Sequence, residues 1–249
     1  MITAFINQKG GTCKTTSAVN VAAILAADHG KRVLLIDADP QGHASVYLRC
    51  NPEEPGLHLL LMGGGLTINE LKTIAQPTAI EGLSVISAPM HRTHMDLIPK
   101  TARELFLKRR LEGHGFDHVI IDGGPHLDTV AFNVLAAADR YIVPILAEGL
   151  SINGFRDLQN AIQEVRDNIN PGLDFTGLLL CKVDERLRLT RQVIDSLQKR
   201  DFPVIKAKIR SAVKVAESGT AAMPLTLMTP PSPALDDYRA LVQEVFINE

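Results

Sequence analysis

The chain is poor in residues that build covalent or metal-based scaffolds. Its 249 residues include three cysteines, no tryptophan and 4% aromatic residues. Cys13, Cys50 and Cys181 are far apart and form no Cys-x-x-Cys pair. A disulfide framework, a zinc site and an iron–sulfur site are therefore not indicated. Stability must come from a hydrophobic core, and a chain of this length can bury a sizeable one.

Long apolar runs are missing as well. The longest have the length of a strand, far short of the ~20 residues that a membrane-spanning helix needs. The first residues lead directly into an apolar run and a glycine loop, without the charged segment and cleavage site of a secretory signal. These absences predict a cytoplasmic protein.

Net charge is small, but it is unevenly distributed. The whole chain carries −2. Residues 182–214 hold ten Lys/Arg and four Asp/Glu, a balance of +6, so the remainder carries −8. Such asymmetry can mark a surface that binds nucleic acid. The alternative interpretation is a solvated surface with scattered basic side chains.

Short apolar runs alternate with segments of helical periodicity. Runs that are continuous rather than alternating are typical of strands buried on both faces, as in a parallel sheet covered by helices. The expected strands are Ile2–Ile6, Val33–Ile36, Leu83–Ile86, Val119–Ile121, Tyr141–Ile145 and Leu178–Leu180. The expected helices are Thr15–Asp28, Glu104–Glu112, Ile152–Asn168 and Thr190–Lys199.

This alternation predicts an α/β fold: a doubly wound, mostly parallel sheet with helices on both faces. No boundary divides the chain, so we expect one domain over residues 1–249. Two proline- and glycine-rich stretches interrupt the order. Asn51–Gly65 is expected to be irregular, and Met228–Pro233 is expected to be a rigid loop before a final helix.

A glycine-rich loop joins the first expected strand to the first expected helix. It consists of Lys9, Gly10, Gly11, Thr12, Cys13, Lys14, Thr15 and Thr16. Backbone N–H groups of such a loop and of the helix N-terminus converge on phosphate oxygens, and glycines let the backbone approach closely. Lys14 is placed to reach the β- and γ-phosphates, and the Thr15 hydroxyl is placed to bind magnesium.

The loop departs from the usual pattern G-x-x-x-x-G-K-[ST], because Gln8 and Cys13 stand where its glycines would be. The pattern K-G-G-x-x-K-T, with a second lysine at Lys9, instead resembles the deviant Walker A ATPases. That group includes ParA/Soj partition proteins, MinD and the nitrogenase iron protein. Cys13 stands where the group commonly has glycine. We interpret it as a tolerated small residue; the alternative is a reactive thiol, since a helix N-terminus lowers the pKa of a thiol.

Carboxylates follow two other expected strands. Asp37-Ala38-Asp39-Pro40-Gln41-Gly42 resembles the D-x-D-P-Q-G switch I segment of ParA proteins. By this resemblance Asp39 positions the attacking water, Asp37 supports the magnesium shell, and Gln41 belongs to the nucleotide site. Asp122 ends an apolar strand in the Walker B arrangement and would hold magnesium, together with Thr15. Ligands of open α/β sheets bind at this strand edge. The following Gly123-Gly124-Pro125 differs from the family's D-x-P-P, and a more mobile turn is expected there.

Asn7–Gly11 together with Asp37–Gly42 resembles the ParA/Soj branch in particular, and the resemblance spans nearly the whole chain. It implies ATP and ADP as ligands with Mg²⁺, and an ATP-dependent homodimer in which Lys9 reaches the partner's nucleotide. Lys9, Lys14 and Asp39 would be the catalytic residues. It further implies slow ATP hydrolysis stimulated by a ParB-type or adaptor protein, during segregation of plasmid or chromosomal DNA or of another cargo. A DNA-binding domain before the loop is not expected, since the loop starts at residue 9.

The same resemblance implies non-specific DNA binding and a nucleoid-associated location. Val213–Glu217 resembles the segment of Soj-type proteins that carries DNA-contacting basic residues, and it overlaps the basic stretch. Lys214 and Arg210 are the first candidates. The full set of candidate DNA-binding residues is Arg186, Arg188, Arg191, Lys208, Arg210 and Lys214.

Three other functions are less compatible with the sequence. A MinD-like positioning ATPase acting at a membrane needs a basic amphipathic final helix, but here the polar face holds Asp236, Asp237 and Glu244 against one Arg239. Core packing is therefore expected for its apolar face, which consists of Leu235, Tyr238, Leu241, Val242, Val245 and Phe246. A nitrogenase-type reductase needs a cluster-binding cysteine, and neither Cys50 nor Cys181 is suitably placed. A metabolic P-loop kinase would lack Lys9 and the Asp37–Gly42 segment.

Overall fold

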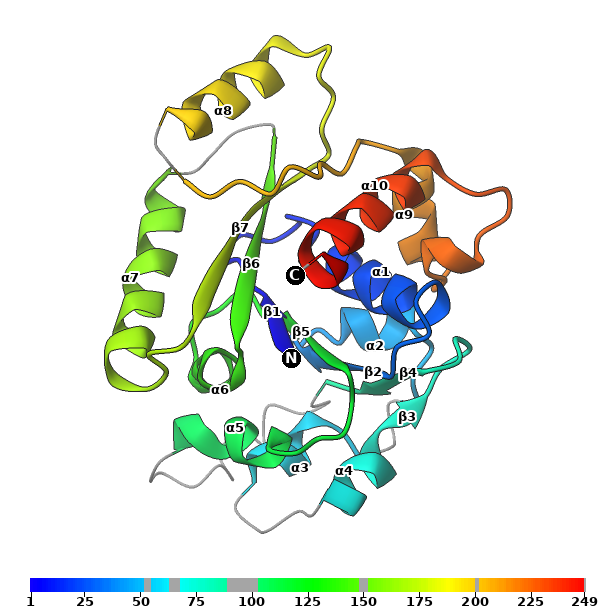
Figure 1. Ribbon diagram of the computed structural model, residues 1–249, viewed down its shortest axis with the longest axis vertical. Coiled ribbons are helices and arrows are strands. Elements are labelled where there is room, and N and C mark those ends of the chain that lie inside the picture. Colours follow the sequence, from blue (N-terminus) through cyan, green and yellow to red (C-terminus); the bar gives the residue numbers. More distant parts are fainter. Residues whose placement is uncertain (52–54, 63–67, 89–102, 148–151, 200–201, 249) are drawn as a thin grey trace.

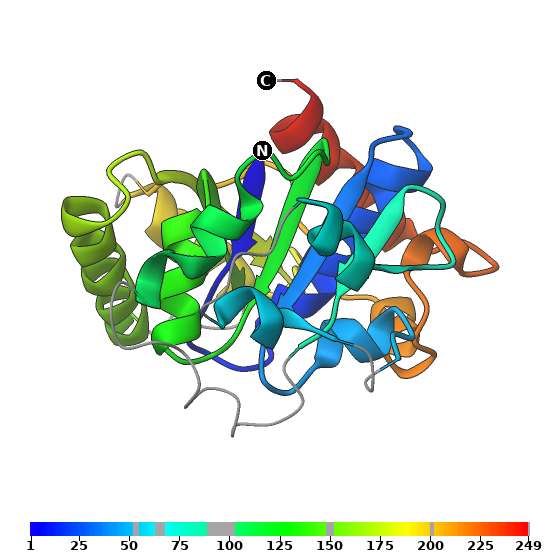
Figure 2. The same ribbon diagram turned by 90° about the horizontal axis from the view of Figure 1, so that it is seen from below.

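The computed structural model describes residues 1–51, 55–62, 68–88, 103–147, 152–199 and 202–248. Within these residues the chain forms a seven-stranded sheet with helices on both faces (Figure 1 and Figure 2). The strands are β1 (Ile2–Phe5), β2 (Val33–Ala38), β3 (Gln76–Pro77), β4 (Leu83–Ile86), β5 (His118–Gly123), β6 (Arg140–Leu146) and β7 (Asp174–Cys181). The α-helices are α1 (Lys14–Ala27), α2 (His43–Tyr47), α3 (Leu57–Leu61), α4 (Ile68–Ile74), α5 (Phe106–Leu111), α6 (Thr129–Ala137), α7 (Ile152–Asn168), α8 (Arg188–Gln198), α9 (Val213–Thr220) and α10 (Pro233–Val242). Short 3₁₀ turns at Arg103–Leu105 and Leu225–Leu227 and a π turn at Gln243–Ile247 complete the description.

The strands lie in the order β3-β4-β2-β5-β1-β6-β7, and every pair except β3–β4 is parallel. All six predicted strands are present, and the predicted fold class is confirmed. The sequence did not reveal β3, a two-residue antiparallel edge strand that contains a proline. Such a strand leaves no periodicity, and proline is tolerated only at an edge of this kind.

The continuous apolar runs arise because each strand is covered on both faces. Successive side chains of a strand point to opposite faces. Leu34 and Ile36 join a core covered by α3, α5, α6 and α7, whereas Val33 and Leu35 join a core covered by α1, α2 and α10. Figure 1 shows these two helical layers on either side of the sheet.

Helix α1, which follows the glycine-rich loop, is buried around most of its circumference. It lies between the sheet and α10, so small and aliphatic side chains suit nearly every position (Figure 1). The helix that carries Lys14 and Thr15 is thus held firmly from both sides.

Several helices differ from the sequence-based expectation. Helix α3 lies within the Asn51–Gly65 stretch that was predicted to be irregular, so that prediction was wrong for residues 57–61; residues 52–54 and 63–65 lie outside the described part. The sequence also did not reveal α2, α4, α6 and α9. Helix α6 had a usable signal, because Asp128 caps its first turn by accepting from the N–H groups of Val130 and Ala131 at 3.0 and 3.1 Å.

The last helix packs into the core, as predicted. Its six apolar residues are each 7% exposed or less. Ser232 caps it and Pro233 occupies its first turn, while the polar side holds Arg239, whose Nε donates to Asp28 at 2.7 Å. Residues 228–232 before it form neither helix nor strand, as expected for a loop, whereas Pro233 already belongs to the helix.

Candidate nucleotide site and basic surface

The strand order brings the predicted site residues to one edge. β5 lies between β1 and β2, and all three run in the same direction. The register pairs Asp122 with Asp37 on one side and with Phe5 on the other. Because the glycine-rich loop follows β1, it lies beside both carboxylates at the carboxyl edge of the sheet, where ligands of such folds bind.

The glycine-rich loop is held by hydrogen bonds that cannot be seen in the sequence alone. Asn7 Nδ2 donates to the Pro144 carbonyl at 2.7 Å, and Asn7 Oδ1 accepts from the Lys9 N–H at 3.0 Å. The Thr12 hydroxyl donates to the Lys9 carbonyl at 3.2 Å. Asn7 therefore ties the start of the loop to β6. In the sequence, the sign of this role is its position two residues before Lys9.

The backbone of the loop leaves room for an anion. Gly11 has a φ of +74°, a conformation that favours glycine. A Cβ atom added at Gly10 or Gly11 would meet no other atom within 4 Å, so both residues border open space. Lys14 is only 6% exposed; desolvation lowers the pKa of its ammonium, while Asp122 and Asp39 raise it. A buried cation beside an open glycine loop suits a phosphate group.

Asp37 is a fully buried carboxylate held by helix α2. Its Oδ2 accepts from the backbone N–H of Ser45 at 2.7 Å and from the Ser45 hydroxyl at 2.6 Å. Its Oδ1 accepts from the Asp39 N–H at 3.2 Å. Burial raises the pKa of Asp37 to about 6, although the bonds from Ser45 oppose the rise. Ser45 could not be identified from the sequence, because a helix of five residues shows no clear apolar periodicity.

Asp122 is buried and, among the described residues, neither of its carboxylate oxygens accepts a hydrogen bond of normal geometry. Burial and the charge of Asp37 raise its pKa well above the usual value; the Thr15 hydroxyl and Lys14 oppose the rise. An orphaned buried carboxylate is costly unless a cation or ordered water completes its contacts. A magnesium ion with its water shell fits this requirement.

The described side chains do not form a complete metal site by themselves. Within the described ranges, no group of three or more His, Cys, Asp or Glu side chains could hold a metal ion. Mg²⁺ commonly keeps several waters and binds through one or two carboxylates plus phosphate oxygens. Thr15, Asp122 and Asp37 therefore fit an ion that arrives together with a nucleotide.

Asp39, which follows β2, lies close enough to Lys14 to raise the pKa of its ammonium against the effect of burial. Asp39 is 6% exposed, and its Oδ1 accepts from the Gln41 N–H at 2.9 Å. Gln41 and Lys9 are exposed.

A Cβ added at Gly123, the last residue of β5, would lie 2.9 Å from both the Phe5 carbonyl oxygen and Ile6 Cγ2. Tight packing against β1 therefore accounts for a glycine at this position.

The six candidate DNA-binding residues lie around α8, α9 and the segment that connects these two helices. Residues 204 and 210 form parallel bridges with Leu178 and Val183, so this segment runs along the free edge of β7. Four of the six cations have a carboxylate partner. These pairs are Arg186–Asp184 at 2.7 Å, Lys208–Glu185 at 2.8 Å, Arg210–Asp237 at 2.7 Å and Lys214–Glu217 at 3.6 Å.

These pairs differ in how firmly they hold the cation. Arg210 donates to both carboxylate oxygens of Asp237 at 2.7 Å, and its backbone N–H donates to the same group at 3.0 Å. Arg210 is thus a weaker candidate than the sequence indicated. In the described part of the chain, Arg188 and Arg191 have no carboxylate partner, and both are exposed. They become the stronger candidates on α8.

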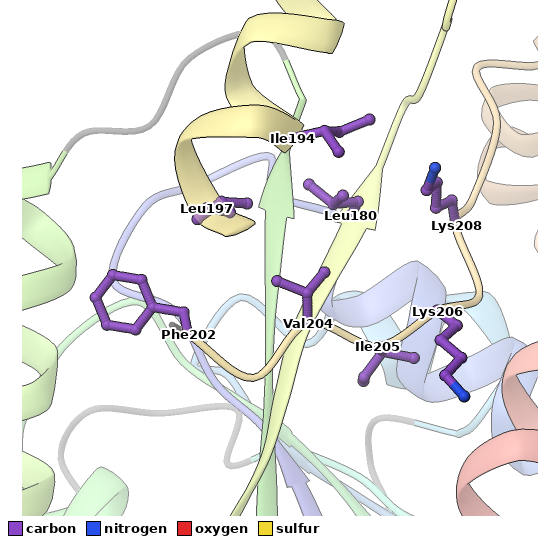
Figure 3. Close-up of a pocket in the computed structure, with 8 residues that line it drawn as sticks. All are labelled: Leu180, Ile194, Leu197, Phe202, Val204, Ile205, Lys206 and Lys208. Atoms are coloured by element: carbon purple, nitrogen blue, oxygen red, sulfur yellow. The ribbon is translucent and has the colours of Figure 1, made fainter. Parts of the chain in front are cut away.

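A cavity of about 450 Å³ separates α8 from the sheet. Figure 3 shows Ile194 and Leu197 of α8 facing Leu180 and Val204 across it, with Phe202, Ile205, Lys206 and Lys208 completing the lining. The helix that carries Arg188 and Arg191 therefore covers partly empty space. Among the described residues, no helix combines the length and apolar composition needed to cross a membrane.

Comparisons with known proteins agree with this geometry. A family model described as an AAA domain matches residues 1–175. The sporulation initiation inhibitor protein Soj of Bacillus subtilis is 36% identical over 255 residues, which cover 99% of this chain and 98% of that protein. The chromosome-partitioning ATPase Soj of Thermus thermophilus is 35% identical, covering 97% of this chain and 94% of that protein.

A solved structure shows the same architecture with ligands present. It is cobyrinic acid a,c-diamide synthase from Mycobacterium smegmatis with a bound ATP analogue and magnesium. The TM-score is 0.77 at 29% identity, and the match covers 97% of this chain and 94% of that one.

Proposed function

We propose that this chain, which belongs to the Soj/ParA family of partition ATPases within the ParA/MinD superfamily, works as a single-domain, ATP-driven switch for DNA segregation. With ATP and Mg²⁺ two copies associate face to face, and the dimer binds DNA without sequence preference. A ParB-type or adaptor protein then stimulates slow hydrolysis, which separates the subunits and releases the DNA. The cargo is plasmid or chromosomal DNA, or another particle carried on DNA.

One observation carries the nucleotide part of the proposal. A buried lysine, two facing buried carboxylates and an open glycine loop meet at the carboxyl edge of the sheet. Among the described residues, no hydrogen bond of normal geometry reaches the Asp122 carboxylate, although the Thr15 hydroxyl lies near it. In the ligand-free state this arrangement is electrostatically unfavourable, and Mg²⁺ with a nucleotide would satisfy it.

Each residue of the site then has a distinct task. The loop N–H groups and Lys14 bind the β- and γ-phosphates and neutralise their charge. Thr15 binds the ion, and Asp122 and Asp37 hold its water shell. Bound magnesium supplies charge neutralisation for phosphoryl transfer. Asp39 orients the attacking water, because catalysis of this reaction depends mainly on positioning and electrostatics.

Lys9, the exposed lysine at the start of the loop, suits a contact with a second subunit. Lys9 is exposed, in contrast to Lys14, yet its backbone is fixed by Asn7. Its charge would complete the partner's site in the dimer. Such an arrangement couples association to ATP, since each subunit's triphosphate provides the anion that the other subunit's Lys9 binds.

A chain of contacts connects the nucleotide site with the basic surface. Helix α2 holds Asp37 through Ser45, and its last residue, Tyr47, is hydrogen-bonded through its hydroxyl to Ser218 of α9. Arg49 donates to the carbonyls of Ala221 and Ala222 at the end of α9, each at 3.1 Å. A shift of α2 on nucleotide binding would therefore move α9, which carries Lys214.

The nucleotide-dependent dimer is tested by light scattering with ATP and Mg²⁺. Lys9→Ala should bind ATP but stay monomeric, because only the contact with the partner is lost. Asp39→Ala should bind ATP and remain dimeric, because the water is no longer oriented for in-line attack. A monomeric Asp39→Ala protein with ATP, or a dimeric Lys9→Ala protein, would refute the sandwich model.

DNA binding is tested by fluorescence anisotropy with unrelated duplexes at several salt concentrations. Phosphate contacts carry no sequence information and weaken steeply with salt. Binding should need ATP, because the dimer brings two weak surfaces onto one duplex. Arg188→Glu combined with Arg191→Glu should weaken binding by about tenfold or more, since each subunit loses phosphate contacts.

The matched control is Lys72→Glu combined with Arg109→Glu, on α4 and α5. It changes the net charge equally, but these helices lie far from α8 (Figure 1). Equal loss of affinity in both double variants would show that only overall charge matters. Binding that ignores ATP and salt would contradict the proposed DNA surface.

A further inference from the structure

Two of the three cysteines meet where the glycine-rich loop leads into α1. Cys13 is the residue just before α1, and Cys181 is the last residue of β7. Their thiol groups lie within hydrogen-bonding reach of each other, and Cys13 packs against the core that contains Cys181. Cys181 is fully buried, whereas Cys13 is partly exposed. The contact joins residues that are 168 positions apart in the sequence.

The backbone does not account for a cysteine at this position. Cys13 has a φ of 69°, a left-handed conformation that glycine adopts without strain. For a residue with a side chain it costs on the order of 1 kcal/mol or more. The thiol contact with β7 is thus the specific feature that the side chain adds. This changes the interpretation of Cys13 as merely a tolerated small residue.

The surroundings of the pair are polar but enclosed. Ser17, one turn into α1, lies beside the Cys181 thiol, and its hydroxyl is 3.3 Å from the Tyr238 hydroxyl of α10. Tyr238 is fully buried. Cys13 is therefore the more accessible of the two thiols to an oxidant. The partly exposed thiol and the enclosed thiol therefore have different parts in any oxidation.

We propose that Cys13 and Cys181 form a reversible intramolecular disulfide that closes the phosphate loop to nucleotides. The oxidant is hydrogen peroxide. The Cys13 sulfur attacks the peroxide O–O bond and becomes a sulfenic acid, with release of water. The Cys181 sulfur then displaces the hydroxyl from Cys13, releasing a second water. The two thiols lose two electrons and two hydrogens in total, and hydrogen peroxide becomes two molecules of water. A thiol reductant reverses the change.

The bond should disturb the loop because it is much shorter than the thiol contact. An S–S bond measures ~2.05 Å, so the sulfurs must approach by on the order of 1–2 Å from a non-bonded contact. Cys13 then moves toward β7 and displaces its own N–H and that of Lys14. Misplacement by about 1 Å can cost on the order of 10²-fold in a positioned site. We expect ATP affinity to fall by about tenfold or more; this readout rests on the proposed nucleotide site.

Cys50 provides an internal control. It lies away from the pair, and burial together with the charge of Asp37 raises the pKa of its thiol to about 12. The contact with Cys13 and burial raise the pKa of the Cys181 thiol as well, so the difference lies in position: Cys50 follows α2, whereas the other two thiols contact each other. Cys50 should remain free while the other two cysteines are consumed.

The test uses nucleotide-free full-length protein, treated with hydrogen peroxide and then with an alkylating agent. Mass spectrometry should show a loss of two hydrogens, and peptide mapping should identify the Cys13–Cys181 link. Calorimetry with ATP and Mg²⁺ should show the loss of affinity, and dithiothreitol should restore it. Saturating ATP and Mg²⁺ should lower the fraction of disulfide at equilibrium with a dithiothreitol redox buffer, because coupling between two binding or closing events is reciprocal.

Two variants separate the disulfide from other oxidation. Cys50→Ser should behave as the wild type in every measurement. Cys181→Ser, which keeps a small polar group in the core, should bind ATP when reduced and should form no link; Cys181→Val serves if the serine variant melts at a lower temperature. A folded wild type that forms no link on oxidation overturns the proposal. So does a link that leaves ATP affinity unchanged. If the reduced wild type itself fails to bind ATP, the proposed nucleotide site fails, while the mapping of the link still decides the thiol pair.

Discussion

Replacing Asp37 with asparagine should stabilise the nucleotide-free protein while removing its response to magnesium and ATP. The wild-type carboxylate is buried beside Asp122, and its pKa is raised from 3.8 to about 6. A raised carboxylate pKa means that the folded state binds the proton more tightly than the unfolded chain. The free energy of unfolding therefore falls as the pH rises through 3.8 to about 6, and it stays lower above that range.

The size of the effect follows from the shift. The rise of the pKa from 3.8 to about 6 corresponds to about 3 kcal/mol above pH 6, and linkage leaves roughly half of this at pH 5. Asparagine keeps an oxygen for the two bonds from Ser45, but its NH₂ group replaces the oxygen that accepts from Asp39. Losing that bond costs about 1 kcal/mol. The net gain at pH 7.5 is about 2 kcal/mol, or ~4–8 °C in melting temperature for a chain of this size.

The assay is thermal unfolding in EDTA at pH 5 and pH 7.5, with and without ATP and Mg²⁺. The gain of Asp37→Asn over the wild type should be smaller at pH 5, because Asp37 is then mostly protonated. Ligand should raise the melting temperature of the wild type far more than that of the variant. The control is Asp128→Asn at the start of α6, where asparagine caps equally well. An Asp37→Asn protein that melts at or below the wild-type temperature in EDTA at pH 7.5 would refute the reasoning.

Three further outcomes are expected. Lys14→Ala should abolish ATP binding in calorimetry, because the loop loses the charge that neutralises the β- and γ-oxygens; wild-type affinity would contradict the site. Gly123→Ala should lower the free energy of unfolding in urea by about 1–3 kcal/mol, since its methyl group would meet β1. Gly172→Ala, with only one atom near the added methyl at 3.9 Å, is the control; equal losses would reject the packing argument. Tyr47→Phe should leave ATP affinity unchanged but weaken ATP-dependent DNA binding in anisotropy, because the bond to Ser218 is lost; unchanged DNA binding would reject the α2–α9 connection.

The sequence by itself determined six of the seven strands of the described sheet, the glycine-rich loop and the carboxylates at the ends of two strands. Each depends on neighbours close along the chain. A strand buried on both faces is a continuous apolar run, and Asp37 and Asp122 each close such a run. The loop residues from Lys9 to Thr16 are contiguous, so their pattern is visible without any fold. Short helices such as α2 and α3 escaped prediction because five residues are too few for helical periodicity to show.

Only the tertiary structure decided which of these groups meet and in what electrostatic state. The order β2-β5-β1 places Asp37 opposite Asp122, and burial there raises both pKa values. The bond between Arg210 and Asp237 spans 27 positions and weakens a DNA-binding candidate that looked strong in the sequence. The Cys13–Cys181 contact arises in the same way, because the start of α1 and the end of β7 border the same core. Burial and pairing depend on distances between segments remote in sequence, and the packing of the sheet and its two helical layers sets those distances.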